Sequence, residues 1–208
     1  MGSPTLQPEL TRQGGIGLTL EHPNPTGLSF RYTADAYMGH VRNRIVSIPY
    51  NLFLWRTLNR DSVRTMGVET LGEMAFSSAH HRLSLTSTYT FQHVVLKTPN
   101  SAEPYQLPYT PRHSGSIAIG WENPWMNTAI SLTAVSSRWT TLLHAPTTLL
   151  SRYHEINFSV WRSIHLRSSA TSLTLRGEIL NLSNQHYYVI ARYPMPGISY
   201  KVTATFSF

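Results

Sequence analysis

A period-two alternation of apolar and polar side chains constrains this chain more than any other feature of its sequence. It is clearest over residues 28–39, 82–92 and 198–208, and shorter runs of the same kind recur elsewhere. Period two places successive side chains on opposite faces of a β-strand. Helical periodicity is hard to find. We therefore predict an all-β, antiparallel fold of about nine strands, most of them near the 9–11 residues of a tilted membrane-spanning strand.

The composition favours a sheet with one face in lipid. Only 13% of the residues are charged, and the hydrophobic share is 41% with a mean hydropathy of −0.20. Soluble domains carry about twice as much charge. The apolar faces of the alternating segments contain no Lys, Arg, Asp or Glu, as expected where such a charge would cost about 2–4 kcal/mol at mid-membrane. The core of a soluble sandwich would also exclude charge, so this observation leaves both readings open.

The lengths of the connections separate the two readings. Short connections are expected at His22–Gly27, Ser78–His81 and Glu122–Trp125, long ones at His40–Asp61, Val95–His113, Ser137–Leu150 and Ser183–Tyr193, and an intermediate one at Arg162–Ser169. Short and long connections alternate, as the periplasmic turns and extracellular loops of an outer-membrane barrel do. A soluble sandwich has no reason to sort its loops in this way.

Several functional classes find no support in the sequence. There is no cysteine, no run of about 18 apolar residues, and no signal-peptide pattern at the N-terminus. The net charge of +7 is scattered, which argues against nucleic-acid binding. His80–His81 lacks further ligands at metal-site spacing, and Glu69 and Glu73 suit a polar lumen as well as an acid/base pair. We therefore expect no enzyme activity, no cofactor and no metal site.

Binding is more plausible than chemistry, and the long connection over residues 41–60 is the best candidate. It combines aromatic rings with arginines, a mixture that suits an anionic or ring-containing ligand at a receptor mouth. The alternative is a loop that packs on its neighbours. With a tryptophan from another long connection, the candidate ligand-binding residues are Arg44, Tyr50, Phe53, Trp55, Arg56 and Trp139. A second group of aromatics, expected near strand ends as in the interfacial girdles of a barrel, is Trp121, Trp125, Trp139, Tyr153, Trp161 and Tyr193.

Three stretches resemble the TonB-dependent outer-membrane receptors. The first places Leu6, Pro8 and Glu9 before Gly14 and Gly15; the second is Asn59 followed by Gly67, Val68 and Glu69; the third is Leu180, Asn181, Leu182, Asn184 and Tyr187, followed by Pro196 and Gly197 and a last strand that ends in Phe. Ile198 departs from the pattern, because the family often has Arg after this glycine. The third stretch is the most specific, and the three occur in the family's order over nearly the whole chain.

The resemblance implies what the whole protein would do. Family members are 22-stranded barrels of the Gram-negative outer membrane, with an N-terminal plug and a segment that contacts TonB, and they import a scarce nutrient such as a ferric siderophore, a corrinoid or a glycan. Residues 1–208 would then be the C-terminal part of such a barrel, and we expect the plug, TonB box and signal peptide to lie upstream. Partners would be the lipid bilayer, the ligand, TonB through the plug, and the barrel-assembly machinery. That machinery would read a terminal signal made of Tyr200, Val202, Phe206 and Phe208.

Two alternatives remain open from the sequence. One is a small self-contained outer-membrane barrel of eight or ten strands that acts as a pore or an anchor. The other is a soluble all-β carbohydrate-binding module. The first shares the lipid-facing rows, whereas the second requires another layer of protein against them.

Overall fold

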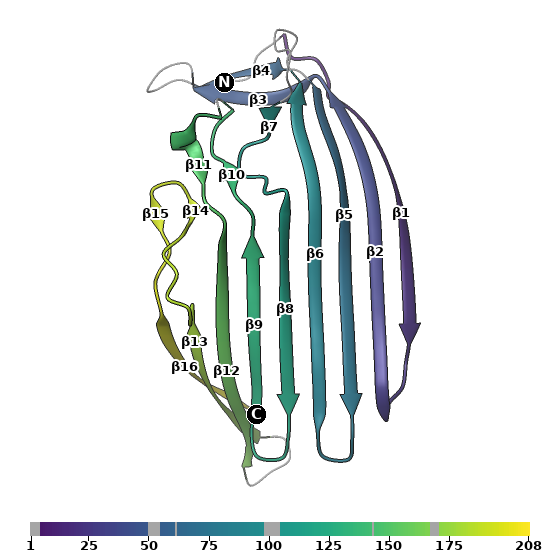
Figure 1. The fold of residues 1–208 in the computed structure, drawn as a ribbon, viewed down its shortest axis with the longest axis vertical. Helices are drawn as coiled ribbons and strands as arrows, with labels where there is room; N and C mark the ends of the chain where they lie inside the picture. Colours follow the sequence, from purple (N-terminus) through teal and green to yellow (C-terminus); the bar gives the residue numbers. More distant parts are fainter. Residues whose placement is uncertain (1–4, 50–54, 61, 98–104, 143, 167–170) are drawn as a thin grey trace.

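A single antiparallel sheet dominates the computed structural model, which describes all residues except 1–4, 50–54, 61, 98–104, 143 and 167–170. Nine strands follow one another in chain order across the sheet, and each pairs with the next (Figure 1). They are β1 (Leu10–His22), β2 (Gly27–Arg42), β5 (Ser62–Ser77), β6 (Arg82–Lys97), β8 (His113–Glu122), β9 (Asn127–Val135), β12 (Tyr153–Leu166), β13 (Thr171–Leu180) and β16 (Ser199–Ser207). The predicted fold class and strand number are confirmed.

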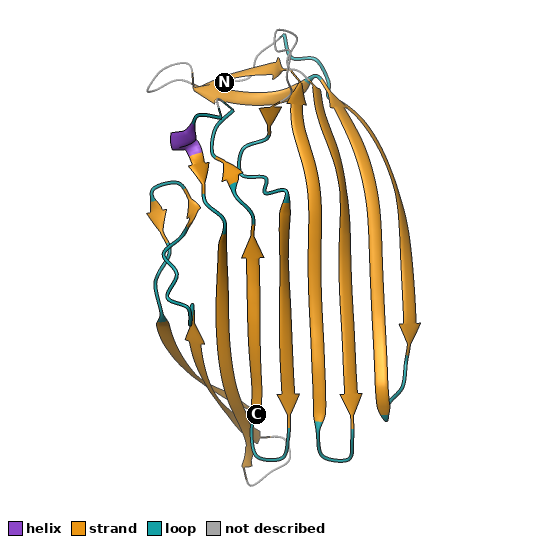
Figure 2. Cartoon of the chain, viewed as in Figure 1, coloured by secondary structure: helices purple, strands orange, loops and turns teal. Residues whose placement is uncertain are grey.

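The connections are sorted by length, as predicted. Short turns join the strands at one end of the sheet, and the long connections lie at the other end (Figure 2). The long connections hold short elements of their own: β3 (Arg44–Pro49), β4 (Trp55–Arg60), β7 (Tyr105–Gln106), β10 (Arg138–Trp139), the 3-10 helix η1 (Pro146–Thr148), β11 (Leu149–Leu150), β14 (Tyr188–Ile190) and β15 (Tyr193–Pro194). Within the described residues, no helix is long and apolar enough to cross a membrane.

Several strands are longer than the sequence suggested. β2, β5 and β6 have 16 residues each and β12 has 14. At about 3.3 Å per residue, 16 residues span about 53 Å, whereas the apolar band of a membrane barrel is only about 25 Å tall. The long strands therefore continue beyond the band. The stretch over residues 66–77, where the alternation was weakest, belongs to β5, and Leu71 lies on the polar face opposite Thr33 and Thr88.

The strand register brings the apolar rows of all nine strands onto one face. Cross-strand partners in an antiparallel sheet point to the same side. One transverse row of Cα partners runs through Leu18, Ala34, Thr70, Tyr89, Gly115, Ala134 and His154. The row two residues nearer the short-turn end contains Leu20, Tyr32, Gly72, Ser87, Ile117, Leu132 and Ile156. We call this side the apolar face and the opposite side the polar face.

The apolar band runs obliquely to these transverse rows. Its limit toward the long loops is marked on successive strands from β1 to β12 by Arg12, His40, Arg64, His93, His113, Ser136 and His154. On β1, Arg12 lies six residues beyond the row of Leu18 in the direction of the long loops. His93 on β6 lies four residues beyond the same row and His113 on β8 lies two residues beyond it, whereas His154 on β12 lies in the row itself. From β1 to β12 the limit of the band shifts by six residues, or about 20 Å along the strands, while it crosses six strand spacings of about 4.8 Å. This shift corresponds to a tilt of the strands of about 35°. Barrel strands tilt by about 35–45° in a membrane, so the band limit lies in one plane.

One expected strand boundary was wrong. Arg162 was expected to begin the connection over Arg162–Ser169, but β12 continues to Leu166 and brings Arg162 onto the apolar face, opposite Leu175. Arg162 is exposed and lies four residues before the end of β12, a strand that runs toward the short-turn end of the sheet (Figure 1). Its long side chain can reach the membrane border while its stem stays along the apolar surface.

Little of the described chain is buried, and the small core lies at the long-loop end of the polar face. Val63, Val94 and Leu96 are each at most 8% exposed. Leu107 and Leu142, from two long connections, pack against them, so those connections fold over the polar face. The apolar face has no covering layer among the described residues: Val202 is 84% exposed and Ile16 78%.

The sheet is also open at both sides. β1 pairs with β2 alone and β16 with β13 alone, as far as the described residues show. Unpaired strand edges are not tolerated within lipid, because their N–H and C=O groups would have no partners there.

Candidate ligand-binding site at the long-loop end

The hairpin of β3 and β4 carries three of the six predicted ligand-binding residues, Arg44, Trp55 and Arg56. Figure 1 shows it lying across the long-loop end of the sheet. Arg44 is half-buried and lies opposite Arg60 in the backbone register of the hairpin. On β4, Trp55 lies opposite Pro49 and Arg56 lies opposite Ile48. Tyr50 and Phe53 lie outside the described residues. No described contact joins Arg44 to Trp139, so the structure does not bring these two together.

Two residues of the family-like motifs hold the base of this hairpin. The side-chain amide of Asn59 donates to the carbonyls of Gln7 and Asn43, both at 2.7 Å, and its oxygen accepts from the Gln7 N–H. The Glu9 carboxylate accepts from the Ile45 N–H at 2.6 Å. These motif residues therefore anchor the segment before β1 to the hairpin above it.

Trp139 belongs to an aromatic group that joins two long connections. Its ring stacks on His144 with ring centroids 4.7 Å apart, and Tyr105 contacts the same imidazole in an edge-on geometry with centroids 5.6 Å apart. His144 Nε2 donates to the Gln106 carbonyl at 3.1 Å. The connection over residues 136–152 is thereby fixed to the one that precedes β8. Sequence reasoning missed His144, because a lone histidine in a loop carries no periodic signal.

Arg138 joins the same connection to the loop that precedes β16. It is only 4% exposed, and its Nη2 donates to the carbonyls of Tyr188 and Val189, both at 2.9 Å. Its guanidinium carbon lies 5.4 Å from the ring centroid of Tyr153. Nη1 has no hydrogen-bond partner among the described residues. Charge-assisted bonds of this kind contribute about 1.5–3 kcal/mol each, so Arg138 ties the two loops firmly together.

A tyrosine pair continues this cluster toward β12. Tyr153 and Tyr187 stack with ring centroids 4.3 Å apart, and the Tyr187 hydroxyl donates to the Glu155 carboxylate. Burial raises the pKa of Tyr187 above its ordinary value, and the bond to Glu155 and the charge of that carboxylate raise it further. The hydroxyl therefore remains a donor at any physiological pH, and the loop over residues 181–198 is held against the polar face.

Asn181 organises the turn at which that loop begins. It is 2% exposed and adopts a left-handed backbone with φ of 51°, a conformation that asparagine tolerates better than most residues. Its amide nitrogen donates to the carbonyls of Gln185 and Pro196, and its amide oxygen accepts from the Gln185 N–H. Asn184 accepts from the Ile198 N–H in the same turn. The two asparagines of the third family-like stretch thus close one loop.

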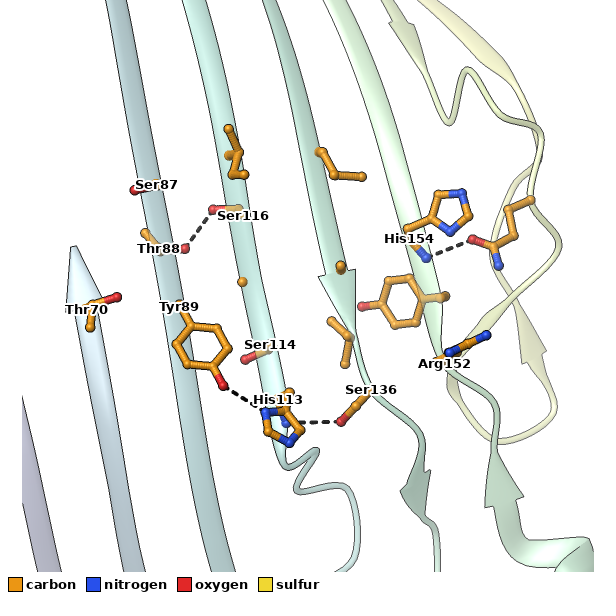
Figure 3. A pocket seen from close by; sticks show the side chains of 17 residues that line it. Thr70, Ser87, Thr88, Tyr89, His113, Ser114, Ser116, Ser136, Arg152 and His154 are labelled. Carbon is orange, nitrogen blue, oxygen red and sulfur yellow. Dashed lines mark hydrogen bonds between the residues drawn. The ribbon is translucent and has the colours of Figure 1, made fainter. Parts of the chain in front are cut away.

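One groove opens mainly on the apolar face of the sheet. Its volume is about 790 Å³. Tyr89 and His113 line one side, joined by a 2.9 Å hydrogen bond, and His154 lies on the other side (Figure 3). Ile117 and Leu132 form its apolar part. By the register, these five side chains lie on the apolar face, and Tyr153 and Gln185 of the loop cluster also line the groove.

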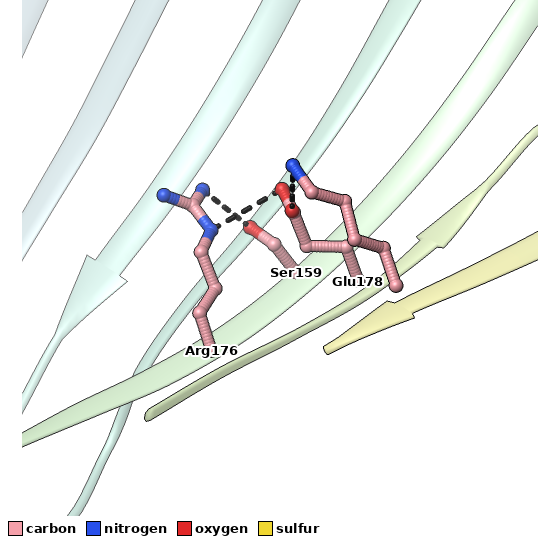
Figure 4. Close-up of polar contacts among 4 residues, drawn as sticks. Ser159, Arg176 and Glu178 are labelled. Carbon is pink, nitrogen blue, oxygen red and sulfur yellow. Dashed lines mark hydrogen bonds and ion pairs between the residues drawn. The ribbon is translucent and has the colours of Figure 1, made fainter. Parts of the chain in front are cut away.

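The polar face carries partnered charges near the last hairpin. Arg176 Nε lies 3.2 Å from one Glu178 oxygen, and Lys201 Nζ lies 3.2 Å from the other. Arg176 also donates to the Ser159 hydroxyl at 3.3 Å (Figure 4), and its guanidinium carbon lies 5.0 Å from the ring centroid of Trp161. A polar wall of this kind suits a wet lumen. The described residues contain no group of three or more His, Cys, Asp or Glu that could hold a metal ion.

Comparison with known families decides the assignment. Residues 1–182 match the family model described as TonB dependent receptor-like, beta-barrel. This chain belongs to that family. TonB-dependent receptors are transporters of the Gram-negative outer membrane and not enzymes, so the predicted family and location are confirmed. The long connections are therefore extracellular and the short turns periplasmic. No match is found among curated proteins.

Solved structures share the fold at low sequence identity. BauA, the ferric preacinetobactin receptor from Acinetobacter baumannii, is 16% identical over 95% of this chain and 29% of its own, with a TM-score of 0.67. The copper transporter OprC is 17% identical, and the match covers 100% of this chain and 33% of OprC with a TM-score of 0.67. The FrpB iron transporter from Neisseria meningitidis (F3-3 variant) is 9% identical, and the match covers 99% of this chain and 31% of FrpB with a TM-score of 0.70. The chain thus spans about a third of the length of these receptors.

The predicted assembly signal has the expected geometry, although its role is untested. Tyr200, Val202 and Phe206 lie on one face of β16 and are exposed, and Phe208 follows at 96% exposure. The rings of Phe206 and Phe208 lie 6.1 Å apart. Recognition by the assembly machinery stays a prediction.

Proposed function

We propose that this chain forms the C-terminal wall and part of the extracellular mouth of a receptor that imports a scarce nutrient with energy passed through TonB. One observation supports this best. Three long connections interlock over the polar face through Arg138, His144 and Tyr187. A mouth fixed in this way presents cationic and aromatic groups above a polar lumen, which suits a ferric siderophore, a corrinoid or a glycan. The plug and the TonB-contacting segment would lie in the remainder of the receptor.

The two alternatives have less support. A self-contained pore would need β1 and β16 to pair, and the described sheet is open at both strands. A soluble carbohydrate-binding module would need cover over the apolar face, where Val202 and Ile16 are largely exposed.

The proposal is tested by uptake in cells that produce the intact protein. Labelled ferric siderophores, corrinoids and oligosaccharides are offered to cells with and without a functional TonB. We expect one class to accumulate only when both the receptor and TonB are present. The variant Trp139→Ala should weaken binding of that class, because it removes the ring stacked on His144. Trp125→Ala, at a periplasmic turn, is the matched control and should have no effect. TonB-independent passage of all three classes would favour a simple pore instead.

A further inference from the structure

A hollow of about 580 Å³ opens mainly on the polar face of β1, β2 and β5, toward their extracellular ends. Gly39 forms its floor, and the direct Cα partners of this glycine, Gln13 and Thr65, form its two sides. The floor is open because Gly39 has no side chain, and a Cβ built there would have only ordinary contacts at 3.8 Å. The volume lies in the range of small-molecule sites, roughly 300–1,000 Å³.

Tyr37 closes the inner end of the hollow with a ring that lies along the sheet. Its direct Cα partners are Gly15 and Gly67, which have no side chains. A Cβ built on Gly67 would lie 2.6 Å from the Tyr37 hydroxyl oxygen and 2.7 Å from its Cζ, so the tip of the ring rests on the Gly67 backbone. The hydroxyl donates to the Glu69 carboxylate, which holds the ring in this position. The ring is therefore a fixed platform with one face toward the sheet and the other toward the lumen.

The polar side chains around the hollow are uncharged and open to a ligand. They are Thr11 and Gln13 on β1 and Thr65 on β5, and none of the three has a side-chain hydrogen bond within the described part of the chain. Two hydroxyls and one amide supply both donors and acceptors. A ligand with several hydroxyl groups can satisfy them, and it needs no charge to do so.

Carboxylates lie directly inward of the platform. Asp35 and Glu69 are Cα partners two residues nearer the periplasmic turns than Tyr37 and Gly67. Among the described strand residues, the polar face of β1, β2 and β5 has one basic side chain, Arg31, against the four acidic ones Glu21, Asp35, Glu69 and Glu73. Arg31 already pairs with Glu21 at 2.8 Å. This part of the wall repels an anionic ligand, whereas its carboxylates can accept hydrogen bonds from hydroxyl groups.

We propose that the hollow is a subsite for one sugar ring of an uncharged oligosaccharide, which stacks on Tyr37 and hydrogen-bonds Gln13 and Thr65. The negative face of an aromatic ring attracts the C–H groups of a sugar, because the neighbouring oxygens polarise those groups. The subsite lies near the strand ends that lead into the β3–β4 hairpin (Figure 1). It rests on the proposed import of a nutrient through this lumen, and it selects glycans among the three classes named there.

The test measures binding of uncharged tetrasaccharides of glucose, galactose, mannose and xylose to the intact protein in detergent by titration calorimetry, without TonB. Tetragalacturonate is the charged probe. We expect one neutral tetrasaccharide to bind and tetragalacturonate to bind more weakly. Gly39→Leu fills the hollow and Tyr37→Ala removes the platform, so each should weaken binding about tenfold. The matched control is Thr33→Leu, on the same face of β2 but six residues farther inward than Gly39. It should bind like the wild type.

A second measurement reports whether the hollow is open in the intact receptor. Thr65→Cys is treated with a small water-soluble thiol reagent, and the reaction at position 65 is read by peptide mass spectrometry. We expect reaction in the free protein and protection by the tetrasaccharide that binds.

Four results would overturn the proposal: no binding of any neutral tetrasaccharide, equal binding by Gly39→Leu and the wild type, equal binding of tetragalacturonate, or no reaction of Thr65→Cys in the free protein. The last would mean that another part of the receptor fills the hollow. Heat-modifiable migration in electrophoresis verifies that each variant is folded. If Tyr37→Ala does not fold, Gly39→Leu decides, because a Cβ at residue 39 has room.

These outcomes are separate from those of the uptake experiment. TonB-dependent uptake of a siderophore, with no sugar bound at the hollow, would remove the subsite and leave the proposed function standing. Sugar binding that Gly39→Leu abolishes, without TonB-dependent uptake, would do the reverse.

Discussion

Replacing Leu85 by arginine places a charge on the apolar face of β6, between Met74 of β5 and Ile119 of β8. Leu85 lies eight residues along β6 from the band limit at His93, which is about 22 Å at a tilt of about 35° and places it nearer the periplasmic border than the centre of the band. A lipid-facing arginine costs about 2–4 kcal/mol at the membrane centre and about 0–1 kcal/mol at the borders, so about 1–2 kcal/mol is expected here. The ratio of folded to unfolded protein should therefore fall about 5- to 30-fold, since each 1.4 kcal/mol corresponds to a factor of ten. The effect arises from lipid alone, because no described residue covers this face.

The next residue along the strand provides the control. Thr86 is exposed on the polar face, opposite Glu73 and Ala118. Thr86→Arg should change stability by about 0.5 kcal/mol or less, the usual range for a solvated position. Urea unfolding of the intact protein in phospholipid vesicles measures both variants. Equal losses for Leu85→Arg and Thr86→Arg would refute the assignment of the two faces.

Three further predictions concern the loop cluster. Arg138→Gln should make the loop over residues 181–198 accessible to protease, because the carbonyls of Tyr188 and Val189 lose their charged donor. Each of these bonds contributes about 1.5–3 kcal/mol. Unchanged cleavage would show that other contacts hold the loop. Asn181→Ala should lower unfolding stability by about 2–4 kcal/mol through lost hydrogen bonds and the left-handed backbone, and Asn181→Gly should recover the backbone part of that loss. The folded state holds the pKa of Tyr187 above its ordinary value near 10, so its contribution to stability is complete below pH 10 and is lost as the pH rises beyond it. Tyr187→Phe should flatten that alkaline decline in thermal unfolding scans, and an unchanged decline would contradict the assigned hydrogen bond.

The faces of the strands could be predicted because alternation is a local property. Membership of the apolar face needs only the parity of a residue within its strand, and Tyr200, Val202 and Phe206 were placed correctly on that basis. The sorting of loop lengths was readable for the same reason. Strand ends were harder to predict, since β12 continues past the clear alternation and carries Arg162 with it.

The loop cluster could not be predicted, because its contacts join residues far apart in the sequence. Arg138 donates to the carbonyls of Tyr188 and Val189, which lie some fifty positions away in the sequence, and no periodic pattern predicts such a contact. Asn181 was noticed as part of a family-like stretch, but its role in closing a loop follows only from the geometry. The extracellular limit of the apolar band was equally hidden, because Arg12, His40 and Arg64 lie on different strands and only the register brings them together.

The alternation of lipid and water along β6 tests the central claim most directly. The chain contains no cysteine, so single cysteines introduced at residues 83–90 of the intact protein can each carry a nitroxide spin label in a bilayer. We expect collisions with oxygen to dominate at Leu83, Leu85, Ser87 and Tyr89, and collisions with a water-soluble nickel complex to dominate at Ser84, Thr86, Thr88 and Thr90. Accessibility without a period of two, or water contact at both sets, would contradict a sheet whose apolar face meets hydrocarbon.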